Sequence, residues 1–186
     1  MKTRAALVLL TALASAGGAS APRPAEATVL FAATLDELSR EAGLVAVVTP
    51  TAERRSYWRD GRVVTDVVCA VTATIKGPAA PTTLVRLPGG VVGAVGQSVS
   101  GAPELPAGVP VVVFLSPVRE GARTVLSMAA GVLPMAAPGG VVTVLPAHTE
   151  GITFLPGRPS RPATVVVPAQ GLPLATFVTR VRAVTP

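Results

Sequence analysis

The chain has a single cysteine and a single histidine, and this scarcity excludes several classes of function. One cysteine cannot form an internal disulfide, so a domain built from this chain must be held together by packing. A zinc site needs three or four cysteine, histidine or carboxylate ligands, and Cys69 and His148 lie far apart. The acidic residues are scattered and form no calcium-binding loop. We therefore expect no metal and no cofactor.

Charged and aromatic residues are also scarce, at 14% and 3% of the chain. The formal net charge is +6, and it falls to about +4 once the leader described below is removed. Apart from Lys76, every basic residue that remains is an arginine. Dedicated nucleic-acid-binding domains usually carry a larger basic excess, so we expect no nucleic-acid partner.

The first 27 residues have the three-part layout of a secretory signal peptide. Lys2 and Arg4 give a positive start, residues 5–14 are almost wholly apolar, and small residues follow. Small-x-small cleavage sites end at three alanines: Ala16, Ala21 and Ala27. We expect cleavage at the last of these; an uncleaved anchor is the alternative. No later run approaches the roughly 20 apolar residues that span a bilayer, so we predict a secreted or periplasmic protein.

The rest of the chain, residues 28–186, is predicted to be one β-rich domain with its core at about 44–131 and a loop-rich extension at 132–186. Nineteen prolines and 18 glycines argue against a helical protein, and the abundant valines favour strands. Residues 62–75 alternate with a period of two, which predicts a long strand with one face in the core. Such a strand usually bends or joins two sheets. The predicted fold class is all-β, a small OB-like barrel.

Two short helices are expected at the ends of this domain. Thr34 and Glu37 have the spacing of a capping box, and Gly43 is a natural helix stop. Near the C-terminus, residues 172–184 place apolar side chains at helical spacing. Further strands are expected at 44–49, 82–87, 109–115, 123–130, 141–144 and 164–167. Cys69 lies in an apolar run and is expected to be a small buried side chain.

The segment 56–115 resembles a group of uncharacterised secreted bacterial proteins. The resemblance rests on Trp58 and on residues 61–65, 75–77, 89–93, 96–97, 101–103 and 112–115. The layout is also similar to the netrin-like modules of tissue inhibitors of metalloproteinases, through a long strand ending in Lys76-Gly77 and a late apolar strand. That similarity implies an OB-type barrel and, as a hypothesis, an inhibitor or accessory protein of a secreted protease. The cysteines that those inhibitors use are absent here.

A hydrolase is a second alternative, based on Ser98 and His148. The sequence Gly96-Gln97-Ser98-Val99-Ser100 differs by one residue from the nucleophile elbow, which requires glycine where Ser100 stands. The elbow also precedes a helix, which residues 101–103 do not favour. A serine hydrolase needs a base and an acid in contact with the serine. Since no pattern supplies them, we predict that the chain is not an enzyme.

One segment combines the chain's only tyrosine and only tryptophan with arginines. The candidate ligand-binding residues are Arg54, Arg55, Tyr57, Trp58, Arg59 and Arg62. They lie in the polar stretch 51–61 and in the residue that follows it. This segment is predicted to connect the first two strands. In an OB-type barrel this connection helps form the ligand face. Arginine beside aromatic rings can bind anions, glycans, single strands or proteins. We predict an exported binding or structural domain whose partner is an extracellular or envelope protein or an anionic ligand; a solvated hairpin with Trp58 folded back is the alternative.

Overall fold

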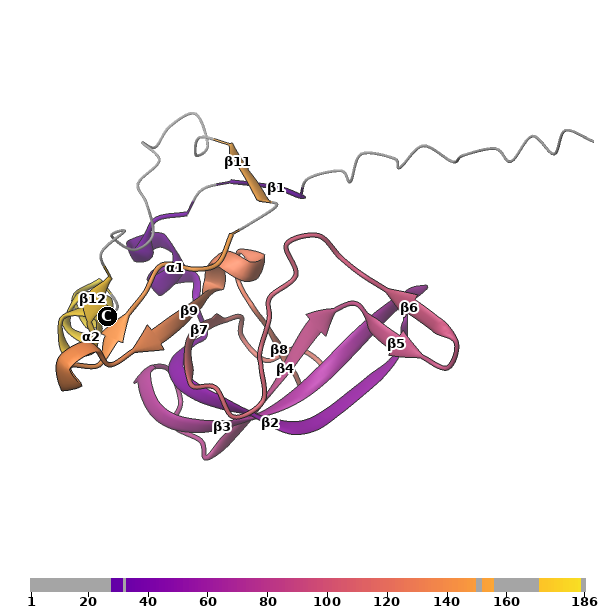
Figure 1. Ribbon diagram of the computed structural model, residues 1–186, viewed down its shortest axis with the longest axis horizontal. Helices are drawn as coiled ribbons and strands as arrows, with labels where there is room; N and C mark the ends of the chain where they lie inside the picture. Colours follow the sequence, from indigo (N-terminus) through magenta and orange to yellow (C-terminus); the bar gives the residue numbers. More distant parts are fainter. Residues whose placement is uncertain (1–27, 32, 150–151, 156–170, 185–186) are drawn as a thin grey trace, which may run out of the picture.

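The computed structural model describes residues 28–31, 33–149, 152–155 and 171–184 of the chain. The predicted signal peptide and the strand expected at 164–167 lie outside the described residues. The described part is mainly β, with two α-helices at one end of a large sheet and a small hairpin at the other (Figure 1). None of the helices described is long and apolar enough to cross a membrane.

The large sheet has eight strands. In spatial order they are β12 (Leu172–Pro173), β10 (Thr143–Val144), β9 (Val132–Ala136), β7 (Val111–Leu115), β2 (Leu44–Arg59), β3 (Arg62–Lys76), β4 (Thr82–Pro88) and β8 (Arg123–Thr124). Neighbouring strands are antiparallel except β4 and β8, which are parallel. Within the described ranges the two edge strands, β12 and β8, do not pair with each other, so the sheet is not closed into the predicted barrel.

The remaining strands form two small sheets. They are β1 (Thr28–Phe31) with β11 (Ile152–Leu155), in parallel, and the hairpin of β5 (Gly90–Val92) and β6 (Val95–Gln97). The helices are α1 (Leu35–Glu41), α2 (Leu174–Ala183) and two 3-10 turns, Met128–Gly131 and Pro138–Gly140. The strand expected at 123–130 is shorter than predicted, because the chain enters the first 3-10 turn after β8.

The two helix predictions are confirmed. In α1 the Thr34 hydroxyl accepts a hydrogen bond from the Glu37 amide at 3.1 Å, and the Glu37 carboxylate accepts one from the Thr34 amide at 2.9 Å. These two amides at the start of the helix thus have partners. The α2 helix buries Phe177 and Val181 against the sheet, as its apolar spacing predicts.

Strands β2 and β3 are long because they serve two hydrophobic cores. The β2–β3 ladder shifts register at three places, between Val45 and Ala46, between Val47 and Val48, and between Pro50 and Arg54. Such bulges bend a strand and change which side chains face inward. The single core face expected along residues 62–75 is therefore wrong: Ile75 joins one core, whereas Val67 and Cys69 join the other.

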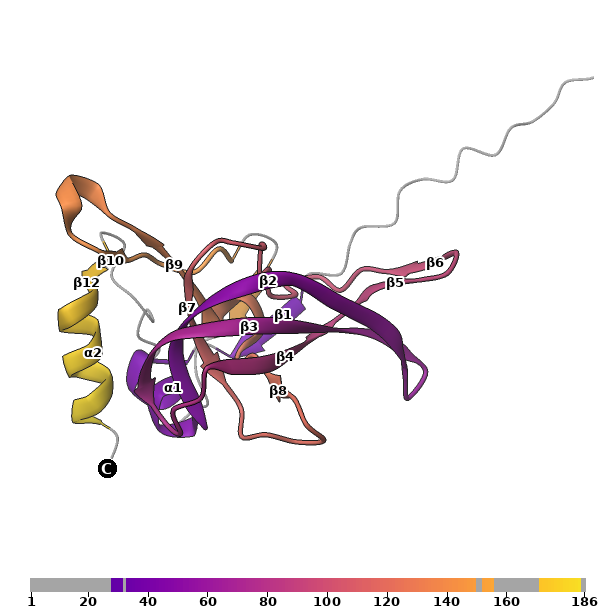
Figure 2. The same cartoon turned by 90° about the horizontal axis from the view of Figure 1, so that it is seen from below.

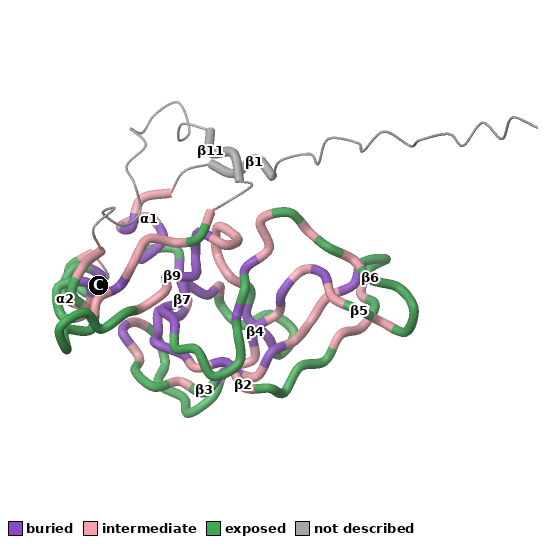
Figure 3. Tube along the Cα trace, viewed as in Figure 1, coloured by how far each residue is buried: buried purple, intermediate pink, exposed green. Residues whose placement is uncertain are grey.

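The two cores lie on opposite faces of the sheet. The first is covered by α1 and α2 (Figures 1 and 2) and contains the edge-to-face pair Phe114–Phe177, with ring centroids 6.1 Å apart. The second is covered by the chain between β6 and β7, which contributes Leu105. Cys69 lies in this second core with no exposed surface, which confirms its expected burial. Both cores involve the first half of β2, whose residues up to Val48 are buried (Figure 3).

Candidate functional site

The segment 54–62 is the end of a β-hairpin, so its prediction as the connection between the first two strands is wrong. The alternative, a hairpin with Trp58 folded back, is correct in its hairpin, but Trp58 is 52% exposed. β2 continues to Arg59, and β3 begins at Arg62 after the two-residue turn Asp60-Gly61. Both turn residues have positive φ, 48° and 72°, which is the geometry of a type I′ turn. Asp-Gly between strands is a strong hairpin signal in sequence. This part of the strand is exposed and carries long polar side chains. A prediction that relies on alternating apolar residues therefore misses it.

The hairpin separates the six candidate residues onto two faces. Arg59 pairs with Arg62 and Tyr57 with Val64, without a register shift between them. Because side chains alternate along a strand, residues 55, 57, 59 and 62 share one face, which we call the arginine face. Arg54 and Trp58 lie on the opposite face, so the structure brings together four of the six predicted residues.

An ionic network forms the base of the arginine face. Asp66 receives two hydrogen bonds from Arg86 of β4, from Nε at 2.7 Å and from Nη2 at 2.9 Å. The Tyr57 hydroxyl also donates to Asp66, at 2.9 Å, and the Arg86 guanidinium lies 5.7 Å from the Tyr57 ring centroid. Burial, followed by the hydrogen bond to Asp66, raises the pKa of Tyr57. The Arg86 and Asp66 side chains are each 12% exposed, so the contacts that hold Tyr57 are largely shielded from water.

A cavity of about 700 Å³ opens beside this network, between the hairpin end, β4 and the segment 116–128. The arginines that line it are Arg59, Arg62, Arg86 and Arg119. Arg59 forms ion pairs with Glu120 and, at 3.6 Å, with Asp60. Arg62 and Arg119 are exposed and have no carboxylate partner within the part of the chain that the structure describes. The cavity can therefore bind an anionic group without breaking an existing ion pair.

The opposite face of the hairpin is partly covered by the β5–β6 hairpin. Ser56 and Thr65 are hydrogen-bonded through their hydroxyls at 2.8 Å, and Thr65 donates to the Gly89 carbonyl at 2.7 Å. A Cβ at Gly90 would lie 2.2 Å from the Thr65 hydroxyl, so the close approach of β5 requires glycine here. Trp58 lies two residues closer to the turn than Ser56, and it is 52% exposed.

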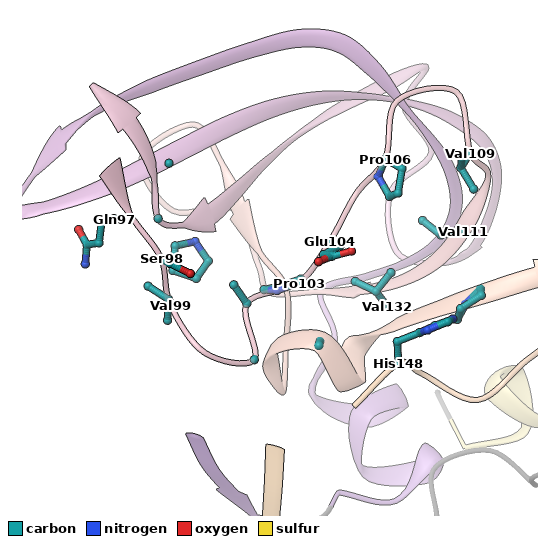
Figure 4. A pocket seen from close by; sticks show the side chains of 17 residues that line it. Gln97, Ser98, Val99, Pro103, Glu104, Pro106, Val109, Val111, Val132 and His148 are labelled. Atoms are coloured by element: carbon teal, nitrogen blue, oxygen red, sulfur yellow. The ribbon is translucent and has the colours of Figure 1, made fainter. Parts of the chain in front are cut away.

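A second cavity, of about 600 Å³, lies between the segment 97–111 and β9 (Figure 4). Its lining includes Ser98, Glu104 and His148, the groups a hydrolase would need. Figure 4 shows Ser98 and His148 on opposite sides of the lining, with Pro103 and Val132 between them. No hydrogen bond in the described ranges joins any two of the three polar groups, so they do not form the contacts of a catalytic triad.

Two further sequence predictions concern metal binding and Cys69. Among the residues described, no three histidine, cysteine or carboxylate side chains lie close enough together to hold a metal ion. Burial raises the pKa of Cys69 to about 11, so its thiol stays protonated at neutral pH and is a poor nucleophile. That the chain binds no cofactor and is not an enzyme remain predictions.

Sequence reasoning missed several members of the site: Asp66, Arg86, Arg119 and Glu120. Asp66 could have been predicted from the Asp-Gly turn, because pairing the two strands outward from this turn places Asp66 opposite Arg55. Arg86 then follows from the β3–β4 register, where it is opposite Asp66. Arg119 carries no such signal, since its segment reaches the hairpin only through the tertiary fold.

Comparisons of the chain with protein-family models, with curated proteins and with solved structures each found no match. The resemblance to secreted bacterial proteins stays a prediction, and the arginine face is the feature from which a function can be inferred.

Proposed function

We propose that this chain is an exported, non-catalytic binding module whose arginine face binds an acidic partner. The observation that supports the proposal is the cavity lined by Arg86, which gathers guanidinium groups from three parts of the chain. The cations of the region are Arg55, Arg59, Arg62, Arg86 and Arg119, and its acids are Asp60, Asp66 and Glu120. Positive charge is therefore in excess.

Arginine suits this role because its planar guanidinium can bind carboxylate or phosphate through two parallel hydrogen bonds. A guanidinium fixed in place before binding loses little side-chain entropy on binding. Arg86 is held by its hydrogen bonds to Asp66 and by its contact with the Tyr57 ring, and Arg59 is held by Glu120. Arg62 and Arg119 then provide the free charges. An acidic protein surface or another polyanion outside the cytoplasm fits this pattern.

The OB-like arrangement belongs to the same proposal. In OB folds, the ligand face includes the loops next to long, bent strands. The bent β2 and β3 strands and their exposed hairpin end support such an arrangement, although the sheet described here is open. Export and removal of residues 1–27 are part of the proposal through the leader sequence.

Removal of the two free arginines tests the proposal. The secreted protein and its Arg62→Gln/Arg119→Gln variant are compared for binding to poly-L-glutamate in low salt. The control is Arg40→Gln/Arg180→Gln, which removes the same charge from α1 and α2, away from the cavity. We expect the site variant to bind about tenfold more weakly than the control, and added salt to abolish the difference. Equal binding by the two variants would refute the arginine face as the site.

A further inference from the structure

The outer half of β2 has a partner strand on only one side. β3 pairs with β2 up to Arg59, but on the other side β7 pairs only with Leu44–Val48. Figure 2 shows β2, β3 and β4 in that order, as in the sheet, with the β5–β6 hairpin near the hairpin end of β2. A strand edge of this kind offers a row of main-chain donors and acceptors. The direction of the main-chain groups of β2 decides which residues can pair with another strand.

The hairpin turn fixes the direction of these groups. A two-residue turn makes Arg59 and Arg62 the closing hydrogen-bonded pair, so the next pair, Trp58 and Val63, does not bond across the ladder. The Val63 carbonyl indeed points to the other side, where it accepts a hydrogen bond from the Gly89 amide at 2.8 Å. The N–H and C=O of Trp58 therefore point away from β3, toward the open edge.

The same alternation continues along the strand. The ladder has no register shift between positions 54 and 59, so Ser56 and Arg54 also direct their main-chain groups outward. In the described part of the chain, no main-chain hydrogen bond connects these three residues to another segment on that side; the one connection there is from the Arg54 guanidinium, which donates to the Leu105 carbonyl. The β5–β6 hairpin contacts the Ser56 side chain and so covers a face of β2.

We propose that the edge of β2 from Arg54 to Trp58 accepts an extended acidic segment of a partner protein as an added strand. This proposal rests on the proposed function and names its partner and binding mode. Strand addition is a common mode of peptide recognition, in which main-chain hydrogen bonds supply affinity and side chains supply specificity. The edge offers up to three outward N–H groups and three outward C=O groups.

The charges along this edge favour an acidic strand over a second copy of the chain. Arg54, Arg55 and Arg59 lie on or beside the edge, and self-pairing would place them near the same arginines of the other copy. Like charges directly opposite each other across a ladder are destabilising, whereas opposite charges are favourable. Acidic residues at alternate positions would meet the arginine face, and apolar residues between them would meet the exposed Trp58.

The probe is a ten-residue peptide that alternates glutamate and valine, with blocked ends. Its control is the same peptide N-methylated at every central residue, which keeps the charge but removes the donors and blocks strand pairing. We expect the N-methylated peptide to bind the secreted protein at least about tenfold more weakly. On binding of the unmodified peptide, the amides of residues 54, 56 and 58 should gain protection from hydrogen exchange.

A protein variant tests the same edge from the other side. Ser56→Pro removes an outward N–H, which proline permits on an edge strand. Ser56→Ala is the matched control, because it also loses the hydrogen bond to Thr65 but keeps the N–H. We expect Ser56→Pro to weaken peptide binding about tenfold relative to Ser56→Ala. If Ser56→Pro does not fold, the N-methylated peptide decides alone.

The outcomes separate this inference from the proposed function. If both peptides bind equally well and neither binds the Arg62→Gln/Arg119→Gln variant, strand addition is overturned, but the arginine face is supported as the binding site. Absence of binding by either peptide and by poly-L-glutamate would overturn both proposals. Protection of the three outward amides together with discrimination between the peptides would support strand addition.

Discussion

Replacing Asp66 by asparagine should lower the stability of the protein and at the same time raise its affinity for anions. The asparagine would keep the size of the side chain but lose the charge that neutralises Arg86. The Arg86 side chain, 12% exposed, would then lack its anionic partner. A variant that only loosened the hairpin would lower both the stability and the affinity. A lower stability together with a higher affinity therefore indicates an electrostatic site.

The size of the stability change follows from the contacts. Breaking a fully buried ion pair on one side costs about 3–5 kcal/mol, and one charge-assisted hydrogen bond about 1.5–3 kcal/mol. Arg86 is not fully buried, and the asparagine oxygen can still accept one of its hydrogen bonds. We therefore expect a loss of about 2–3 kcal/mol in the free energy of unfolding. With a urea m-value of about 2 kcal/mol/M, the midpoint falls by about 1–1.5 M.

The gain in affinity is smaller and depends on salt. One additional unit charge about 7 Å from a bound anion contributes about 0.6 kcal/mol in a water-like dielectric, which is about threefold in the dissociation constant. The gain should disappear near 1 M salt, where the screening length is about 3 Å. Urea unfolding and binding to poly-L-glutamate at two salt concentrations measure the two effects.

The double variant Asp66→Asn/Arg86→Gln is the control. It restores the wild-type net charge, so its affinity should return to that of the wild type while the ionic network is still absent. If Asp66→Asn binds poly-L-glutamate more weakly than the wild type at low salt, Arg86 does not contribute to an anion site, and the arginine face has been misassigned.

Three further predictions concern the two cores and the end of α1. Phe177→Ala removes a ring with no exposed surface and its contact with Phe114, so the free energy of unfolding should fall by about 3–5 kcal/mol in urea titrations; a loss below about 1 kcal/mol would mean that α2 does not stabilise the core. Lys76→Met removes the ammonium that donates to the Ser39 and Arg40 carbonyls at 2.6 and 3.0 Å, and should cost about 1–2 kcal/mol by the same titration, with an unchanged midpoint as the contrary result. Burial raises the pKa of the Cys69 thiol from 9.0 to about 11. Between these two pH values the thiol is protonated in the folded state and ionised in the unfolded state. Its contribution to stability is therefore complete below about pH 9 and is lost as the pH rises to about 11, by about 2–3 kcal/mol relative to Cys69→Ala; parallel pH profiles of the two proteins would contradict it.

The sequence predicted the parts of the fold that depend on local chemistry. The capping box at Thr34, the helix near the C-terminus and the buried Cys69 were predictable because each depends on neighbours in the chain or on an apolar run. The starts of the three strands near residues 44, 62 and 82 were also predictable, because each begins with a run rich in β-branched residues. The open sheet was not predictable, because closure depends on how far each strand twists over the whole sheet.

The candidate site was only half predictable. The arginines and Tyr57 stood out by composition, but their division between two faces depends on the position of the turn. The pattern of apolar residues, which locates buried strands, has no information about a strand that lies outside the cores. The charged end of β2 therefore looked like a loop, and its partners on β4 and in the segment 116–128 could not be placed.

The bulge between Pro50 and Arg54 divides β2 into a part that stabilises the protein and a part that can bind. Before the bulge, β2 lies between two strands and contributes to both cores. After it, the residues of the strand are exposed or half-exposed, β3 is its single neighbour in the sheet, and it carries the arginines. Because residues past the bulge contribute little to the cores, substitutions of exposed residues there should alter binding with small effects on folding. Substitutions such as Val48→Ala should do the reverse and lower stability by about 1–3 kcal/mol while the folded protein binds unchanged. A stable Val48→Ala variant with altered binding would show that the bulge does not separate the two roles.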